Sequence, residues 1–317
     1  MVTLTELLQN QPGLALVTNW FIGILVLLTL GYWLLLWFWP TAGLPKIGSR
    51  IAFLWVMMLT FVLAILYTYK ILILYIWFIA FLALKEFFSM TPTRRADRRV
   101  LFAAYLALPI QFILILLGLR NAFIIYTPVH VFLVLPMVMV LIGDARGFLR
   151  AWSTIGWAII TTVYSLGYLA CLLILPVAAK PTVGGSGLFL FLVGLAQINH
   201  ALQFGFGKLF PNPRFSLPVS KTRNWASLVG STIVTLPIAW LLAPYLTPFT
   251  TTEALIMGAI ISMSAFVGYI ILSAIKTDLQ IKDRGAMTPG HGGVLNRIDA
   301  FIYTAPLFFY LLTAWHY

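Results

Sequence analysis

The stretch "SAIKTDLQIKDRGAMTPGHGGVLNRID", residues 273–299, is a charged segment between two long apolar segments near the end of the chain. It holds three of the eight acidic residues, four basic residues, one histidine and four glycines. The chain as a whole is different, because its 317 residues are 62% hydrophobic and only 9% charged. Soluble domains carry about 25% charged residues. Apolar runs of about 20 residues, long enough to cross a bilayer as a helix, recur along the chain. The sequence therefore predicts an all-α, polytopic membrane protein.

We predict about ten membrane-spanning helices in a single integral-membrane domain, residues 1–317. The second and third helices are expected to form a tight hairpin around "YTYK" (67–70). Cys171 lies inside an apolar run and is expected to be a small buried residue, since a single cysteine cannot form an internal disulfide. The predicted spans cover residues 15–39, 51–68, 70–88, 101–119, 122–142, 152–177, 186–206, 225–248, 254–275 and 299–315.

Basic residues are distributed unequally between the two sides of the predicted bundle. Loops after even-numbered spans contain Lys70, Arg120 and Lys180, whereas loops after odd-numbered spans contain sixteen basic residues. Because Lys and Arg concentrate in cytoplasmic loops, we expect 273–299 to face the cytoplasm of a bacterial inner membrane and both termini to face away. The sixteen are Lys46, Arg50, Arg94, Arg95, Arg98, Arg99, Arg146, Arg150, Lys208, Arg214, Lys221, Arg223, Lys276, Lys282, Arg284 and Arg297.

The net charge of +12 fits this anchoring against anionic lipid headgroups. A binding site for a polyanion is the alternative interpretation. Nucleic acid is not expected as a partner, because no nucleic-acid-binding domain can be recognised.

Polar side chains share one face of the helix that enters the charged segment. Tyr269, Ser273 and Lys276 stand at i, i+4 and i+7, so they lie along one side at the predicted cytoplasmic end. The hydroxyl of Ser273 and the ammonium of Lys276 can both bind an anionic group beside that face. A lysine at the end of a membrane helix is also commonly an interfacial anchor, so this face alone does not identify a site.

The rest of the segment has the composition of a phosphate site. Glycines in "PGHGG" (289–293) allow positive φ, which can aim successive N–H groups at an anion, and the histidine can add a donor. Lys282 and Asp283 precede it, and Arg297 can bind a phosphate with two parallel hydrogen bonds. Asp299 can orient Arg297 or bind a metal. Together these residues suggest a phosphate or nucleotide site, although a glycine-rich turn alone is usually only a turn.

The same residues resemble the C-terminal motif of phosphatidate cytidylyltransferases, also called CDP-diacylglycerol synthases. That motif runs Ser-x-x-Lys-Arg, Lys-Asp-x-Gly, Pro-Gly-His-Gly-Gly and Asp-Arg-x-Asp, and here "SAIKT", "KDRG", "PGHGG" and "NRID" follow at the same spacing. Weaker similarity continues upstream in "ALKEFF" (83–88), "INHALQFGFGKLF" (198–210) and "LPVSKTRNWASLVGS" (217–231). The resemblance therefore implies a cytidylyltransferase-like core over 186–317, preceded by divergent helices over 1–150.

The family joins CTP to phosphatidate and releases pyrophosphate, so the resemblance implies phosphatidate or another anionic phospholipid, CTP and Mg²⁺ as ligands. A homodimer or a membrane partner is a further expectation. By position, the resemblance implies catalytic roles for Ser273, Lys276, Asp283 and Asp299, and substrate binding by Lys208, Ser220, Arg223, Lys282, His291, Gly292, Gly293 and Arg297.

Four acidic residues of the family are replaced in this chain. Tyr269 and Asn296 stand where the family has aspartates that are the expected metal ligands, while His200 and Ala226 replace two more acids. Neutral tyrosine is a poor Mg²⁺ ligand, and asparagine offers an oxygen without charge. Asp283 and Asp299 remain as candidate metal ligands. His200 is either a functional group within a span or a buried structural histidine.

Two functions follow from these replacements. The first is a cytidylyltransferase of weak or altered activity. The second is a catalytically inactive relative, a pseudoenzyme, that binds anionic lipid or a membrane partner. A transporter fits less well, because no pair of broken helices is recognisable in two halves of the chain.

Overall fold

In the computed structural model, the described residues are 12–38, 44–91, 98–141, 147–175, 184–210, 216–217, 220–279 and 293–316. Nine helices among them are long and apolar enough to cross a membrane, and the apolar helix Ile51–Leu66 is shorter. Each of the ten predicted spans falls on one of these segments, so the predicted polytopic all-α fold is confirmed. The predicted hairpin around residues 67–70 is also present, because one helix ends at Leu66 and the next begins at Tyr69.

The helices in chain order are α2 (Pro12–Phe38), α3 (Leu44–Leu66), α4 (Tyr69–Met90), α5 (Arg98–Leu116), α6 (Arg120–Ile125), the π-helix η2 (Tyr126–Val131), α7 (Phe132–Leu141), α8 (Phe148–Ile159), the π-helix η3 (Ile160–Tyr164), α9 (Ser165–Leu172), α10 (Gly184–Leu209), α11 (Trp225–Leu246), α12 (Thr251–Asp278), α13 (Leu295–Ile298) and α14 (Phe301–His316). The strands are β1 (Ser216–Leu217) and β2 (Ser220–Asn224).

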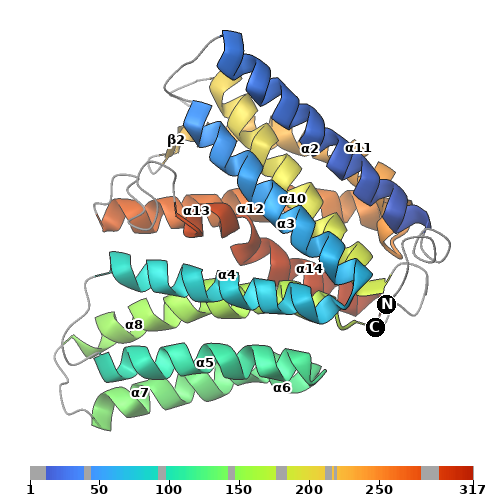
Figure 1. The fold of residues 1–317 in the computed structure, drawn as a ribbon. Coiled ribbons are helices and arrows are strands. Elements are labelled where there is room, and N and C mark those ends of the chain that lie inside the picture. Colours follow the sequence, from blue (N-terminus) through green and yellow to red (C-terminus); the bar gives the residue numbers. More distant parts are fainter. Residues whose placement is uncertain are drawn as a thin grey trace.

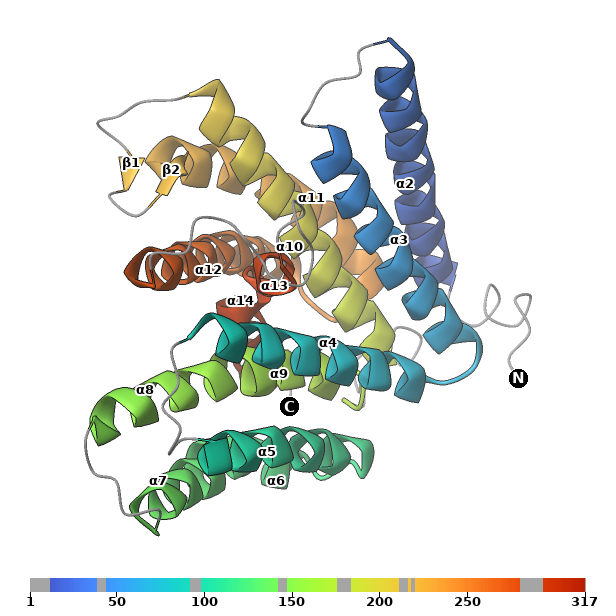
Figure 2. The ribbon, with the colours of Figure 1, turned by 60° about the vertical axis from the view of Figure 1, so that its left-hand side comes forward.

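Helices α12 and α14 lie between two groups of helices. Figures 1 and 2 show α2, α3, α10 and α11 on one side of this pair and α4 to α9 on the other. The interior is mostly apolar, and large side chains such as Phe112, Tyr168, Phe191 and Phe308 are fully buried. Cys171 is buried as predicted. The central position of α12 brings its C-terminal half close to α10, β2 and α13.

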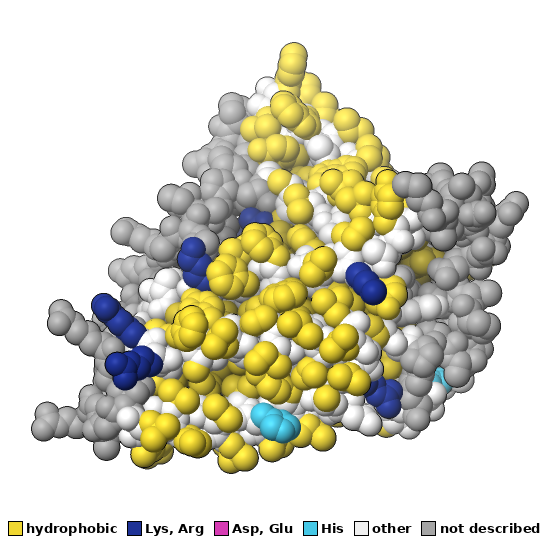
Figure 3. All heavy atoms as spheres, turned by 60° about the horizontal axis from the view of Figure 1, so that its bottom comes forward, with side chains coloured by type: hydrophobic (Ala, Val, Ile, Leu, Met, Phe, Trp, Pro, Cys, Tyr) yellow, Lys and Arg dark blue, Asp and Glu magenta, His cyan; other side chains and the backbone are white. Residues whose placement is uncertain are grey.

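The outer surface suits a lipid environment. Large apolar side chains including Trp20, Trp37, Phe102 and Leu141 are exposed along the helices. Figure 3 shows one face on which hydrophobic side chains form a broad band, with Lys and Arg toward its sides. Soluble monomers rarely expose apolar patches of this extent. The protein is therefore an integral membrane protein.

Two π-helices interrupt the spans formed by α6–α7 and α8–α9, and Pro128 accounts for the first. Proline has no N–H, so the carbonyl of Ile124 lacks its normal helical donor. The hydroxyl of Tyr164, at the end of η3, donates to this carbonyl at 3.0 Å. The side chain of Gln111 similarly donates to the carbonyl of Phe123 at 3.3 Å. Side chains from neighbouring helices thus satisfy the backbone where the α-helical pattern fails, as lipid requires.

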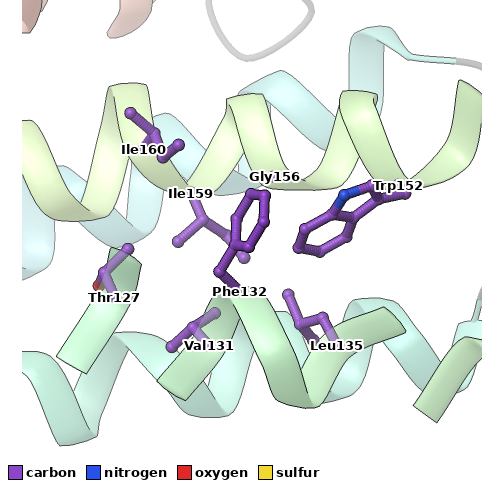
Figure 4. Close-up of a pocket in the computed structure, with 8 residues that line it drawn as sticks. All are labelled: Thr127, Val131, Phe132, Leu135, Trp152, Gly156, Ile159 and Ile160. Carbon is purple, nitrogen blue, oxygen red and sulfur yellow. The ribbon is translucent and has the colours of Figure 1, made fainter. Parts of the chain in front are cut away.

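A small pocket with a cavity volume of about 10 Å³ lies between these two interrupted spans. Figure 4 shows Phe132 and Trp152 facing each other across it, with Thr127 and Ile160 at one end. Its lining is almost entirely apolar, and it belongs to helices other than those that carry the charged motif. The residues that line this pocket therefore serve the packing of α5 to α9 against one another.

The short hairpin before α11 fixes the entry of that helix. Strands β1 and β2 pair antiparallel, with Ser216 opposite Asn224. Asn224 caps α11 by accepting from the backbone N–H of Ser227 at 2.8 Å, and its amide donates to the carbonyl of Phe210 at 2.8 Å. A capping interaction of this kind is worth about 1 kcal/mol. The cap holds β2 against the end of α10, so Arg223, the residue before Asn224, has a defined position.

Candidate functional site

Helices α10, α12 and α13 and strand β2 bring together a set of polar residues from distant parts of the sequence. Two of these segments approach each other closely at Gly268 of α12, where a Cβ atom would overlap the carbonyl oxygen of Asp299, the residue after α13. Only glycine therefore allows the two segments to pack at this separation. We refer to His200, Gln203, Arg223, Tyr269, Lys276, Asn296 and Asp299 as the polar cluster.

Arg223 is the most buried cation of the polar cluster, with only 2% of its surface exposed. Its guanidinium carbon lies 3.8 Å from the centroid of the Tyr269 ring, a cation–π arrangement, and it donates to the side-chain oxygen of Gln203. At the position where the resemblance implies an aspartate, Tyr269 therefore places a neutral ring against the guanidinium group of Arg223.

A buried hydrogen-bond network holds Gln203 in the orientation that Arg223 needs. The Gln203 amide donates to the side-chain oxygen of Asn199 at 2.7 Å and to the carbonyl of Ser262 at 3.1 Å. Asn199 in turn donates to the hydroxyls of Ser262 at 2.7 Å and Thr235 at 2.9 Å. Because both amide side chains are fully buried and donate through their nitrogens, the Gln203 oxygen is left facing Arg223.

Lys276 forms the second cationic contact of the polar cluster. Its ammonium donates to the side-chain oxygen of Asn296, which lies in the single turn of α13. Tyr269, Ser273 and Lys276 share the face of α12 that their spacing predicts. Each of the two neutral replacements for family aspartates is thus in contact with a basic residue.

His200 of α10 and Asp299 form a further polar pair of the cluster. The Nε2 atom of His200 lies 3.8 Å from Oδ1 of Asp299, a distance at which protonated histidine forms an ion pair rather than a close hydrogen bond. Asp299 is 2% exposed, and its Oδ1 accepts from the N–H of Ala300 at 2.7 Å. Of the two sequence interpretations of His200, this geometry fits a polar pair at the site better than an isolated core residue.

Glu86 is a site residue that the sequence reasoning did not identify. It is 3% exposed near the end of α4, and its carboxylate accepts from the N–H of Leu295 at 3.2 Å. Lys276 and Arg297 lie close enough to interact electrostatically with it. A Cβ atom on Gly293 would overlap the same carboxyl group, so glycine is needed there. The sequence does contain a signal for Glu86, because an ionisable residue inside an apolar helix is often functional.

The structure brings several predicted site residues together and leaves others apart. Ser273, Lys276, Arg223, Gly293, Asp299 and Arg297 lie in or beside the polar cluster, and the Arg297 guanidinium packs 4.7 Å from the centroid of the Phe53 ring. Lys208 is exposed, and its ammonium lies over the ring of Phe204 on its own helix at 4.4 Å. Of Ser220 only the backbone is described. Lys282, Asp283, His291 and Gly292 lie outside the described residues.

The described side chains do not fit a Mg²⁺ site. Among them, no group of three or more His, Cys, Asp or Glu residues could hold a metal ion. Tyr269 and Asn296, at the positions of the expected metal ligands, are neutral and contact Arg223 and Lys276. Mg²⁺ prefers oxygen ligands that include at least one carboxylate, and a nearby cation opposes its binding.

The close approach at Gly268 predicts a large difference between two glycine substitutions. Gly268→Ala should destabilise the protein by about 1–3 kcal/mol, because the added methyl group must push α12 away from the backbone of Asp299. Gly205→Ala in α10 is the matched control, since nothing lies within 4 Å of its Cβ position. Thermal unfolding in detergent measures both, and equal melting temperatures for the two variants would contradict the proposed packing.

Comparison with known proteins finds a family and relatives that cover most of the chain. The model of the family described as "Cytidylyltransferase family" matches residues 48–315. A protein of Escherichia coli (strain K12) with the name "Uncharacterized protein YnbB" is 35% identical over 289 residues, which are 91% of this chain and 95% of that protein.

Two phosphatidate cytidylyltransferases match over shorter stretches. That of Mycobacterium leprae (strain TN) is 28% identical over 175 residues, 54% of this chain and 50% of its own length. That of Synechocystis sp. (strain ATCC 27184 / PCC 6803 / Kazusa) is 35% identical over 83 residues, 26% of this chain and 27% of its own length. The matches thus span half or less of these two enzymes. Because the family model covers most of the sequence, the chain belongs to the cytidylyltransferase family.

Proposed function

We propose that this protein binds phosphatidate, or a closely related anionic phospholipid, together with CTP at the polar cluster, and transfers the cytidylyl group slowly. Relatives named phosphatidate cytidylyltransferase support the substrate class. The observation that carries the proposal is the pair of contacts Arg223–Tyr269 and Lys276–Asn296, which retains the basic residues of the site without its two aspartates.

The charges at the site explain why the substrates should bind while their turnover stays slow. Both substrates carry phosphate groups, which repel each other strongly in a low-dielectric site. Arg223, Lys276 and Arg297 can offset that repulsion in the bound state. A bound Mg²⁺ would supply further positive charge to stabilise the transfer step. The described residues provide a poor site for that ion, so the transfer step should be slow.

The second candidate function is binding of anionic lipid without any transfer. The same two contacts favour it, because Arg223 and Lys276 attract phosphate, while Tyr269 and Asn296 stand where the resemblance implies aspartates that hold a catalytic metal. Turnover distinguishes the two functions, since both predict phospholipid binding and only the first predicts CDP-diacylglycerol.

A direct assay tests the proposed function. Purified protein in phosphatidate-containing vesicles, supplied with CTP and Mg²⁺, should form CDP-diacylglycerol well below the rate of an ordinary enzyme, ~1 per second or faster. Complete absence of product with retained lipid binding would establish the inactive relative. Turnover at the ordinary rate would contradict the proposed weakening of the site.

We also propose that the loops following odd-numbered spans face the cytoplasm of a bacterial inner membrane. Sixteen basic residues in these loops against three in the others support this orientation. In a Cys171→Ala background, Ser89→Cys should react with a membrane-impermeant thiol reagent only after the cells are opened. Lys70→Cys, at an exposed position in the first turn of α4, is the control for the outer side and should react in intact cells. Labelling of Ser89→Cys in intact cells would reverse the orientation.

A further inference from the structure

His130 is an ionisable residue on the outward side of the span formed by α6, η2 and α7. It lies ten residues after Arg120 and eleven before Leu141, the ends of that span, and so about 15 Å from each, near the middle of the bilayer. The His130 side chain is exposed, whereas Thr127 and Val131 of η2 are buried. Ionisable residues within a span almost always face the bundle interior or a water-filled cavity, so an outward one at this depth indicates a partner outside the chain.

The contacts that His130 makes within the chain leave its two ring nitrogens available. Its ring stacks on that of Tyr126, one turn earlier, with the centroids 6.1 Å apart and the planes at 22°. Within the part of the chain that the structure describes, the imidazole makes no hydrogen bond or ion pair. The buried Thr127 differs, because its hydroxyl donates to the side-chain oxygen of Gln111 at 2.9 Å. Lipid tails have no hydrogen-bonding groups, so lipid cannot satisfy the nitrogens of His130.

We propose that a second copy of this chain covers His130, and that the two His130 imidazoles hydrogen-bond to each other across a two-fold axis parallel to the membrane normal. Two copies inserted in the same direction carry His130 at the same depth, so such an axis brings the two rings together. A neutral imidazole has one donor and one acceptor, so it can pair with an identical group without burying a net charge. A helix of another protein would need a polar group at this same depth.

The apolar neighbours of His130 give this surface the pattern of a helix-packing face. Leu133, Met137 and Leu141 follow at i+3, i+7 and i+11, and they are 66%, 63% and 75% exposed. Lipid covers such side chains equally well, so they contribute shape, and His130 contributes the hydrogen bond that lipid cannot replace. Figures 1 and 2 show α6 and α7 at the outer edge of the α4–α9 group, away from α12. A second copy at this surface therefore leaves the polar cluster clear, and the inference is independent of the proposed function.

Cysteine cross-linking of the full chain in native membranes tests the identity of the partner. In a Cys171→Ala background, Leu133→Cys should form a disulfide-linked dimer on mild oxidation with copper phenanthroline, because it lies about one turn from the proposed axis. Ile233→Cys on α11 is the matched control. It is exposed to a similar extent, 64% against 66%, but it lies in the other group of helices, so it should stay monomeric.

Substitution of His130 tests the hydrogen bond itself. Energy transfer between fluorescently labelled copies in vesicles, measured at decreasing protein-to-lipid ratios, gives the dissociation constant of the dimer. His130→Phe keeps a ring that can stack on Tyr126 but loses both polar atoms, and it should weaken dimerisation by about fivefold or more. His130→Gln keeps a donor and an acceptor and should dimerise within about twofold of wild type. Because the side chain is exposed, neither substitution should lower the melting temperature in detergent, which checks that both variants fold.

The outcomes distinguish a second copy from other occupants of this surface. A Leu133→Cys dimer, together with weaker association of His130→Phe and retained association of His130→Gln, would support the inference. A disulfide between Leu133→Cys and a different protein, or a dimer linked through Ile233→Cys instead, would overturn the second copy as the partner of His130. Equal dimerisation of wild type and His130→Phe would overturn the hydrogen bond, and a chain that stays monomeric at every protein-to-lipid ratio would overturn the inference as a whole.

Discussion

Replacing Tyr269 and Asn296 together by aspartate should create a divalent-metal site and raise CTP turnover by about tenfold or more over wild type. The two substitutions act differently. Tyr269→Asp removes a ring that the Arg223 guanidinium covers at 3.8 Å, which opens volume and adds a charge. Asn296→Asp changes almost no volume and turns the acceptor of the Lys276 hydrogen bond into a carboxylate. Mn²⁺ binding measured by electron paramagnetic resonance, together with CDP-diacylglycerol formation, checks the result.

Each single aspartate variant should gain much less, because two ligands that hold one ion act as a unit. Tyr269→Asn is the matched control, since it opens the same volume as Tyr269→Asp without adding charge. If the double variant binds no Mn²⁺ and Tyr269→Asn is equally active, the prediction that aspartates at 269 and 296 create a metal site is wrong. An increase in Tyr269→Asn alone would indicate that the ring blocks substrate rather than metal.

The helices were predictable from sequence because bilayer thickness fixes the length of an apolar span. Residues 70–88 and 225–248, for example, coincide closely with α4 (Tyr69–Met90) and α11 (Trp225–Leu246). The π-helices were not predicted, because their cause is only partly local. Pro128 is visible in the sequence, but the donors that make the irregular turn tolerable are Gln111 and Tyr164, from helices that become neighbours only in the fold.

Part of the candidate site was likewise predictable from local sequence, and part of it depends on the fold. The spacing of Tyr269, Ser273 and Lys276 predicted one helix face, since i, i+4 and i+7 is a local relation. Their partners could not be read from spacing. Arg223 reaches Tyr269 from a strand that the sequence reasoning described only as a loop, and Glu86 contacts Leu295 across 209 residues. Such pairs depend on how α4, α10 and α12 pack, which apolar patterns leave undetermined because lipid-facing and buried helices are both hydrophobic.

Loss of the Glu86 carboxylate should have a large effect on both stability and binding. Glu86→Ala removes the acceptor for the buried N–H of Leu295 and the negative charge near Lys276 and Arg297. Leaving a buried donor unsatisfied and two cations less compensated should cost about 3 kcal/mol of unfolding free energy. The turn of α13, which carries Asn296, would lose its attachment to α4, so phosphatidate binding should fall with stability. Unfolding in detergent and lipid titration measure the two effects.

Glu86→Gln separates the two roles of the carboxylate, because glutamine keeps an acceptor for Leu295 and loses the charge. If compensation of Lys276 and Arg297 matters, Glu86→Gln should be intermediate between wild type and Glu86→Ala. If Glu86 acts only as an acceptor, Glu86→Gln should match wild type. Glu253→Gln is the control for removing one acid elsewhere, since Glu253 lies at the other end of α12, where it caps the first turn and pairs with His316 at 3.3 Å. Its change should cost about 1 kcal/mol or less. Wild-type stability of Glu86→Ala would contradict the contact with Leu295. The contact between Glu86 and Leu295 joins α4 to α13. Wild-type stability of Glu86→Ala would therefore also mean that α4 does not contribute to the site.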